Sequence, residues 1–271
     1  MSHEDTIGVQ FDRSPLADQP LVARVLRPMP ELTAPDLAPD VRAMACRAWE
    51  DRTRSEYVGV MIVRRFHGLL ADLNAPMDQQ ELALALQLQE QQHANLCMVA
   101  ARSLGSKGEV AFDTMELQQL RTDRPIQEQF IEMLIGTFVI GERVALALLS
   151  HAVKALPASP YRELLAEILR DEVLHARFGP VLLRQIREGT APRWCPYPGD
   201  AWVKAFVEAH LEAMSKRAVV EPDEAEMFGD PEAGAGLEQV GIPNSRSFKG
   251  AYMDALERDA IDGLREAGIT L

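Results

Sequence analysis

The sequence predicts an all-α protein built around four long helices. Stretches of roughly 25–30 residues are rich in Ala, Leu, Glu, Gln and Arg and are separated by short breaks that contain Pro or Gly. Within these stretches the apolar residues recur every three or four positions, which is the period of an α-helix. Aromatic residues make up only 6% of the chain and little of it alternates with period two, so a β-sheet protein is not expected.

The chain before the first long helix has the composition of an extended arm. Residues 1–40 hold six of the seventeen prolines. Proline lacks the backbone N–H and restricts the preceding residue, so a long helix cannot form there. We therefore expect an N-terminal arm over 1–40, a four-helix bundle over 41–190 and a C-terminal helical extension over 191–271.

The helices are expected to follow one another with short connections, as in a bundle of antiparallel neighbours. The C-terminal extension is expected to contain a loop rich in Gly, Pro and acids between two shorter helices. The predicted long helices span about 41–70, 77–103, 126–155 and 160–187, and the extension comprises a helix at about 200–217, the loop at 221–247 and a helix at about 247–267.

Charge and composition exclude several classes of function. The chain of 271 residues has 41 acidic and 28 basic residues, giving a net charge of −13. Nucleic-acid backbones and anionic membranes are bound by clustered Lys and Arg, so neither is an expected partner. The chain shows no uninterrupted apolar run of 18 residues and no apolar leader at its start, and its three cysteines are too few for a disulfide framework. These features favour a cytoplasmic protein.

A Glu-x-x-His motif occurs twice, on the second and fourth predicted helices. The pairs are Glu90 with His93 and Glu172 with His175. Residues at i and i+3 project from the same face of a helix about one turn apart. Helical bundles that hold two metal ions use this pair on two helices and one inward glutamate on each of the other two.

Glu56 and Glu142 are the best candidates for the two remaining glutamates. Both lie in apolar stripes, on the first and third predicted helices, where an uncompensated carboxylate would be costly. Glu50 lies on a more polar side of the first helix. Glu132 lies on the third helix but is rotated by roughly 80° from Glu142 in a regular α-helix.

The predicted donor set is compensated by two divalent cations. Four glutamates carry a charge of −4, which two such ions neutralise, whereas four buried carboxylates alone would repel one another. Carboxylates with neutral imidazoles suit iron or manganese, while zinc sites use fewer ligands and often thiolate. The alternative is a structural helical bundle in which these acids form ordinary ion pairs.

These residues resemble the ferritin-like superfamily of dinuclear carboxylate proteins. The resemblance covers about residues 41–188 and is carried by Glu56, Glu90-Gln-Gln-His93, Glu142 and Asp171-Glu172-Val-Leu-His175-Ala-Arg-Phe-Gly179. It implies a ferritin-like four-helix bundle with two iron ions, or Mn or a mixed Mn/Fe pair, held by the six ligands Glu56, Glu90, His93, Glu142, Glu172 and His175.

The resemblance also implies roles for three neighbouring residues. Asp171 would accept a hydrogen bond from the metal-bound His93, and Gln89 would serve His175 in the same way. Cys97 occupies a position where the hydroxylase subunits of multicomponent monooxygenases are similar in having a cysteine near the metals. Asp171 as an exposed helix acid and Cys97 as a small core residue remain the alternatives.

The function implied is that of a non-haem di-iron oxygenase or oxidase. It would activate O₂ to oxidise a small organic substrate, and a separate ferredoxin or reductase would supply electrons because the chain has no flavin, nicotinamide or iron–sulfur motif. A homodimer is one expected form of assembly. Two rival functions remain open: an iron-handling protein of the ferroxidase or storage kind, and a Mn/Fe oxidase of the ligand-binding kind that carries a lipid.

Overall fold

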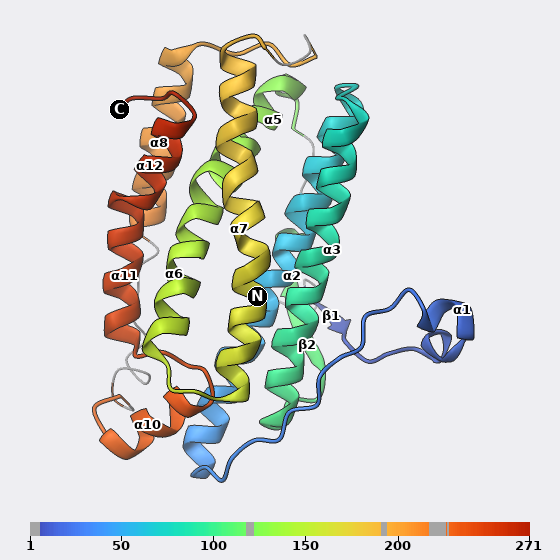
Figure 1. The fold of residues 1–271 in the computed structure, drawn as a ribbon, viewed down its shortest axis with the longest axis vertical. Coiled ribbons are helices and arrows are strands. Elements are labelled where there is room, and N and C mark those ends of the chain that lie inside the picture. Colours follow the sequence, from blue (N-terminus) through green and yellow to red (C-terminus); the bar gives the residue numbers. More distant parts are fainter. Residues whose placement is uncertain (1–5, 118–121, 191–193, 217–225, 227) are drawn as a thin grey trace. The chain divides into compact units, whose positions relative to one another are not determined.

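The computed structural model describes residues 6–117, 122–190, 194–216, 226 and 228–271, and the chain divides into two compact units (Figure 1). Unit 1 comprises Met1–Arg64 and Ala85–Arg121, and unit 2 comprises Arg65–Leu84 and Thr122–Leu271. Two consecutive long helices, α2 (Pro39–Asp72) and α3 (Met77–Ser103), each contribute one end to each unit. Helices dominate the described residues and the sheet has only two strands, so the predicted all-α class is confirmed.

Unit 1 joins parts of α2 and α3 to a short pair of strands. Strand β1 (Thr6–Gln10) pairs antiparallel with β2 (Glu109–Asp113), which leads into α4 (Thr114–Leu117). The rings of Phe11 and Phe112 pack on Tyr57 of α2 at centroid distances of 5.9 and 5.2 Å. The aromatic contacts and the strand pairing thus attach the start of the chain to unit 1.

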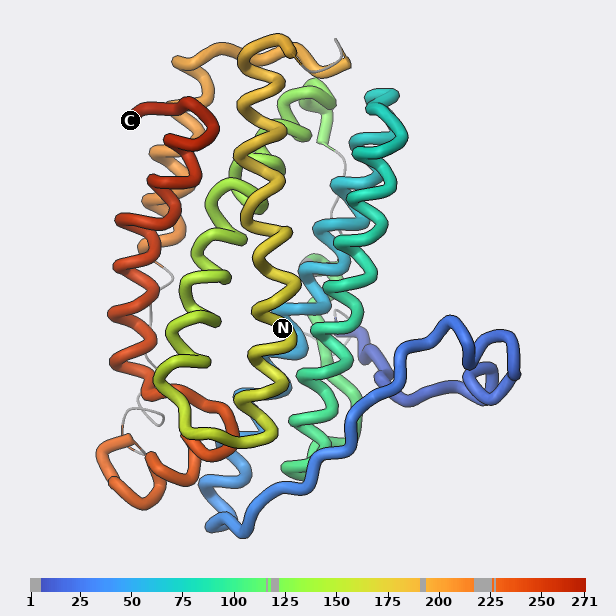
Figure 2. Tube along the Cα trace, in the orientation of Figure 1, coloured from blue at the N-terminus to red at the C-terminus, as the bar shows by residue number. Residues whose placement is uncertain are grey.

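The remainder of the arm has little regular structure, as its prolines predict. It contains the short helices η2 (Pro15–Asp18) and α1 (Pro20–Ala23) and then runs without further secondary structure to the first residue of α2. Figure 2 shows this segment as the dark blue tube between β1 and α2. The strand β1 is an addition to the predicted extended arm.

Unit 2 contains a long helical segment that is regular at both ends and wider in the middle. It begins as α5 (Ile126–Met133), continues as the π-helix η3 (Leu134–Gly141) and ends as α6 (Glu142–Ala155). The sequence predicted one regular helix over 126–155, and that prediction is wrong in its central part. A π-helix inserts residues into the turn and so changes which side chains share a face.

Helix α7 (Pro160–Arg187) packs along η3 and α6 (Figure 1). Its start is defined locally, because Ser159 Oγ accepts a hydrogen bond from the backbone N–H of Arg162 at 3.2 Å and Pro160 occupies the first helical position. The predicted helix over 160–187 is therefore confirmed at both ends.

The C-terminal part of unit 2 has more helix than the sequence predicted. After α8 (Asp200–Ser215), the helix α10 (Pro231–Gln239) lies inside the predicted loop, and the predicted last helix is divided into α11 (Ser245–Glu257) and α12 (Asp259–Glu266). Part of that loop, 221–225 and 227, lies outside the described residues, as do 217–220 before it. Helices α11 and α12 pack against α6, and α12 also contacts η3 and α7 (Figure 1).

In the described part of the chain, Ile126–Ala155 is the one helical stretch long and apolar enough to cross a membrane, with a mean hydropathy of 1.7. Length and composition alone are weak support for a membrane span, because the core helix of a soluble protein has the same properties. Phe130, Ile135 and Phe138 in this stretch are fully buried. The middle and end of this stretch pack against α7, α11 and α12.

Candidate metal centre

Unit 1 brings together three of the six predicted ligands. Glu56 projects from α2, and Glu90 and His93 project from successive turns of α3. One ligand atom from each of the three residues lies within 4.8 Å of the others, and His93 Nδ1 is 3.6 Å from Glu56 Oε2. Glu90 is 5% exposed and His93 is fully buried. We call this group the unit 1 triad.

Unit 2 brings together the other three predicted ligands. Glu142 begins α6, and Glu172 and His175 occupy successive turns of α7. His175 Nδ1 lies 3.5 Å from Glu172 Oε2 and 3.9 Å from Glu142 Oε2. All three residues are buried. This group, the unit 2 triad, has the same donors as the unit 1 triad: two carboxylates and one imidazole nitrogen.

The spacing of the donor atoms fits a shared cation in each triad. The carboxylate oxygens lie 3.5 to 3.9 Å from the imidazole Nδ1 atoms, which is longer than a hydrogen bond between charged groups. Two donors bound to one ion at about 2.0–2.2 Å lie roughly 3–4 Å apart, depending on the angle between them. Carboxylate and imidazole donors without thiolate suit iron or manganese. The residues present therefore fit a metal ion in each unit.

Gly59 leaves the space that the carboxylate of Glu90 occupies. A Cβ atom built on Gly59 would lie 2.5 Å from Glu90 Oε2 and 3.1 Å from its Cδ. Both distances are shorter than ordinary van der Waals contact. A glycine at this point of α2 thus allows the carboxylate of Glu90 to lie against the backbone of α2. Glu56, which belongs to the same triad, lies one turn earlier in α2.

The π-helix η3 positions Glu142 in unit 2. Glu142 follows Gly141 directly, and a Cβ on Gly141 would lie 3.1 Å from the carbonyl oxygen of Gly136. Gly136 in turn allows close approach of α8, because its Cβ would lie 3.0 Å from His210 Cε1. π-helical segments are rare and are frequent at functional sites, where they change the direction of the side chains that follow.

The two competing glutamates have other surroundings. Glu132 pairs with Arg124, whose Nη2 lies 2.7 Å from the carboxylate, on a partly exposed surface of unit 2. Glu50 is half-buried, and its charge raises the pKa of Cys46, after the larger effect of burial. Neither acid belongs to the groups that could hold a metal ion among the described residues.

The three residues implied by the resemblance lie beside the triads in the sequence. Cys97 is fully buried one turn beyond His93, and burial together with the charge of Glu56 raises the pKa of its thiol well above the ordinary value. Gln89 and Asp171 are half-buried and directly precede Glu90 and Glu172. Their expected histidine partners belong to the other unit in each case, so these two roles stay predictions.

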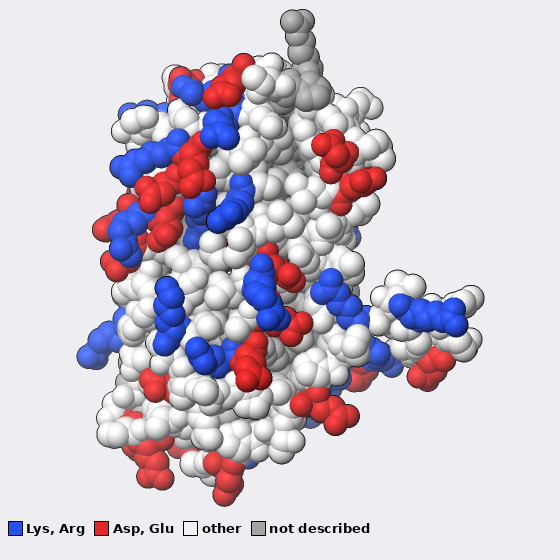
Figure 3. All heavy atoms as spheres, viewed as in Figure 1, with Lys and Arg blue, Asp and Glu red and all other residues white. Residues whose placement is uncertain are grey.

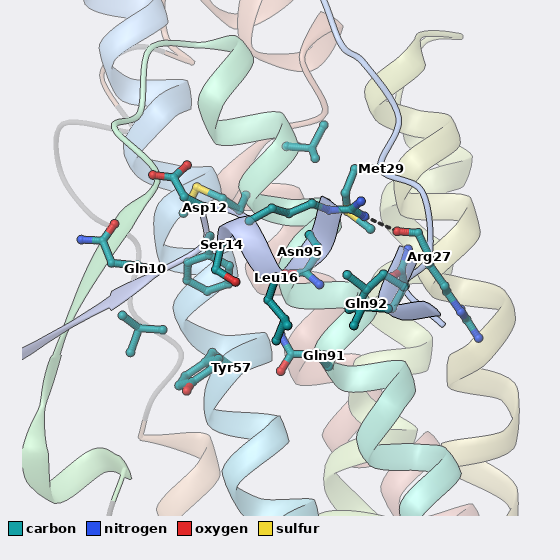
Figure 4. A pocket seen from close by; sticks show the side chains of 18 of the residues that line it. Gln10, Asp12, Ser14, Leu16, Arg27, Met29, Tyr57, Gln91, Gln92 and Asn95 are labelled. Carbon is teal, nitrogen blue, oxygen red and sulfur yellow. Dashed lines mark hydrogen bonds between the residues drawn. The ribbon is translucent and has the colours of Figure 1, made fainter. Parts of the chain in front are cut away.

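The N-terminal arm lines a cavity of about 810 Å³ in unit 1. The floor is formed by α3, and Gln91 and Gln92 there are the two central residues of the Glu-x-x-His motif. Figure 4 shows these side chains and Asn95 opposite Leu16 and Met29 of the arm. The arm therefore covers the face of α3 that adjoins the motif.

Sequence reasoning missed an aromatic cluster in unit 2. The rings of Phe66 and Phe138 lie 4.5 Å apart, and Phe178 lies 4.8 Å from Phe138 and 6.0 Å from Phe66. Phe138 lies four residues before Glu142 and Phe178 lies three residues after His175. The sequence His-x-x-Phe, which ends in Phe178, could have indicated this cluster. It places the ring one turn from His175 on the same face of α7.

Comparison with known proteins supports the fold. No protein-family model and no curated protein matches the chain. Among solved structures, the chain is similar to a Synechococcus protein with aldehyde deformylating oxidase activity, with a TM-score of 0.50 and 18% sequence identity. The match covers 83% of this chain and 94% of that chain. At this identity the likeness concerns the fold alone, and it agrees with the all-α class.

Proposed function

We propose that the protein is an O₂-dependent oxidoreductase of the non-haem di-iron kind, an oxygenase or oxidase that acts on a small organic substrate. The observation that supports the proposal is the repeated triad: in each unit two carboxylates and one imidazole lie close together, and all of these side chains are buried except the half-buried Glu56. A dinuclear centre that uses all six residues follows from the sequence repeat. Two iron ions, or Mn or Mn/Fe, are the proposed cofactor.

The protein residues position the metal ions, balance their charge and keep water away from the donor atoms. The four glutamates balance the charge of two divalent ions, and each histidine presents Nδ1 to its triad. When bound, the metal pair supplies the redox chemistry of O₂. Buried aromatic and aliphatic side chains around Glu142 and His175 exclude water from the donors.

In this proposal the segments outside the predicted bundle cover it. The arm over 1–40 and the extension over 191–271 shield the bundle over 41–190 from solvent. The cavity lining by the arm in unit 1 and the packing of α11 and α12 on α6 in unit 2 support this role. O₂, an organic substrate and an external electron donor are the expected partners, the cytoplasm is the expected location, and a homodimer is one expected form of assembly.

The first test is metal content by inductively coupled plasma mass spectrometry. We expect about two Fe or Mn per chain in the wild type, and a loss of about one or both in Glu142→Ala. The matched control is Glu132→Ala, which removes the competing acid of the same long helical segment and should keep both metals. Wild-type protein that holds less than about 0.2 transition metal per chain after anaerobic Fe(II) loading would contradict the proposal.

Activity and assembly distinguish the proposed function from its rivals. Reduced, iron-loaded protein should consume O₂ in the presence of an organic substrate. Iron oxidation without any organic substrate, together with assembly into a shell, would instead indicate iron storage. A tightly bound lipid with a Mn/Fe pair would indicate the ligand-binding oxidase.

A further inference from the structure

Unit 2 contains a cavity of about 330 Å³ between the end of α2, the start of α3 and the C-terminal half of α7. Its size is at the lower end of the range of about 300–1,000 Å³ that is usual for small-molecule sites. Eight of the twelve residues that line it are apolar, and the other four are Asp78, Gln79, Arg177 and Gln185. The apolar lining consists of Phe66, Leu70, Leu82, Ala83, Leu174, Phe178, Val181 and Leu182.

The mouth of this cavity is an exposed apolar surface. Leu174 and Val181 of α7 are 40% and 43% exposed, and Met77 and Leu84 of α3 are 68% and 52% exposed. In Figure 3 the surface over α7 beside the first turns of α3 is mainly uncharged, whereas charged side chains crowd the surface of α11 and α12. Asp78 and Arg177, both exposed, also line the cavity, so an apolar molecule reaches it across an apolar surface that has one acidic and one basic group beside it.

One polar atom in the lining is buried and lacks a protein partner. Gln79 lines the cavity, and its Oε1 is buried without a hydrogen-bond partner among the described residues. A buried carbonyl oxygen without a donor is costly, by an amount comparable to a lost hydrogen bond. A ligand with one hydroxyl or amino group would supply the donor.

The aromatic cluster shares two residues with the cavity lining and lies close in sequence to residues of the unit 2 triad. Phe66 and Phe178 belong both to the cavity lining and to the cluster with Phe138. Phe178 lies one turn beyond His175 on the same face of α7. A Cβ on Gly179 would lie 2.3 Å from the carbonyl oxygen of Phe138, so the backbone of α7 is held close against η3 at this level.

From these contacts we propose that the 330 Å³ cavity binds the substrate, an aliphatic molecule with a single hydroxyl or amino group, and that Phe178 is a positioning residue between this cavity and the unit 2 triad. The inference rests on the proposed function, because it assigns the substrate class of the same metal centre. Gln79 accepts the hydrogen bond of the polar group, and the apolar lining holds the chain.

The first experiment measures binding of 1-octanol by calorimetry, in metal-free and metal-loaded protein. We expect Val181→Lys to weaken binding by at least about tenfold, because it places a charge in the apolar mouth. Val173→Lys is the matched control: Val173 lies on the same helix and is 40% exposed but does not line the cavity, so its variant should bind as the wild type does. Equal loss in both variants, or no binding to the wild type, would overturn the proposal.

The second experiment tests the hydrogen bond and the link to the metal. 1-Methoxyheptane has the length of 1-octanol but no donor, so the wild type should bind it about tenfold more weakly, and Gln79→Met should abolish that preference. Carbon-13 relaxation of bound 1-octanol should be faster in Co(II)-loaded than in Zn(II)-loaded protein. Binding without faster relaxation would refute the role of the cavity at the metal centre.

The metal content of the same samples distinguishes failure of the substrate site from failure of the proposed function. Protein that holds two metal ions but does not bind 1-octanol contradicts the substrate site alone. Protein that binds 1-octanol but holds no transition metal contradicts the proposed function, and with it the assignment of the ligand as a substrate.

Discussion

A single methyl group added at Gly59 should weaken metal binding without weakening the fold. In Gly59→Ala the new Cβ would lie 2.5 Å from Glu90 Oε2, whereas ordinary contact begins at 3.4 Å. The carboxylate must therefore move by about 0.9 Å, which exceeds the tolerance of roughly 0.5 Å for functional groups in a preorganised site. We expect the metal affinity of the unit 1 triad to fall at least about tenfold, which corresponds to about 1.4 kcal/mol.

The same substitution should not destabilise the metal-free protein. Replacing glycine by alanine within a helix favours folding by about 0.5–1 kcal/mol. The clash at Gly59 involves the end of a flexible side chain, which can rotate away, so it offsets only part of this gain. Gly68→Ala in the same helix is the control, because a Cβ there meets no atom within 4 Å. Its metal affinity should equal that of the wild type and its stability should rise by the full amount.

Two measurements decide the outcome. Urea denaturation of metal-free protein gives the free energy of unfolding of both variants, and competition titration with Co(II) gives the affinity of each metal site. Wild-type affinity at both sites in Gly59→Ala would show that Glu90 does not bind metal in the position described, and would refute the assignment of the unit 1 triad. A large loss of metal-free stability would instead refute the inference that the carboxylate can move freely.

Two further predictions concern the backbone contact in unit 2 and the cysteines. Gly179→Ala should lower the free energy of unfolding by about 3 kcal/mol, the upper end of the usual cost of overpacking. The new Cβ would lie 2.3 Å from the carbonyl oxygen of Phe138, and a backbone atom cannot rotate away from it. Unchanged stability in urea denaturation would contradict that contact. Iodoacetamide at pH 8, followed by mass spectrometry, should modify the half-buried Cys46 first and Cys97 and Cys195 only after unfolding. Burial raises the pKa of Cys195 from 9.0 to about 12, so the folded state binds more protons than the unfolded state between these values. The stability that this thiol contributes is complete below pH 9 and should be lost as the pH rises toward 12, and a Cys195→Ala variant should lack this part of the alkaline loss.

Local sequence signals determined the long helices. The structure places α3 at Met77–Ser103 and α7 at Pro160–Arg187, the ranges that apolar periodicity and the Pro-containing breaks predict. The sequence also carried local signals for α10. Asp230 caps this helix by accepting a hydrogen bond from the N–H of Glu232 at 2.9 Å, and Pro231 occupies the first helical position. The Gly and acid content of that segment led to the incorrect prediction of a loop.

Contacts between distant segments could not be predicted in the same way. β1 and β2 pair residues such as Gln10 and Glu109, which are far apart in sequence, and a five-residue strand carries no strong pattern of its own. The π-helix η3 also escaped prediction, because the 3.6-residue period assumes a regular α-helix. The estimated angle between Glu132 and Glu142 therefore rested on a geometry that the segment does not have.

Glu-x-x-His at i and i+3 is a property of a single helix, so the sequence was enough to predict which donors share a helix face. The apolar surroundings of Glu56 and Glu142 in the sequence also made them candidates. The folded chain was needed to show that each of these glutamates approaches a histidine, that Gly59 makes room for Glu90, and that a cavity residue lies one turn from His175. Helix period and capping act over a few residues, whereas close approach and cavity shape depend on side chains from segments that are far apart in the sequence.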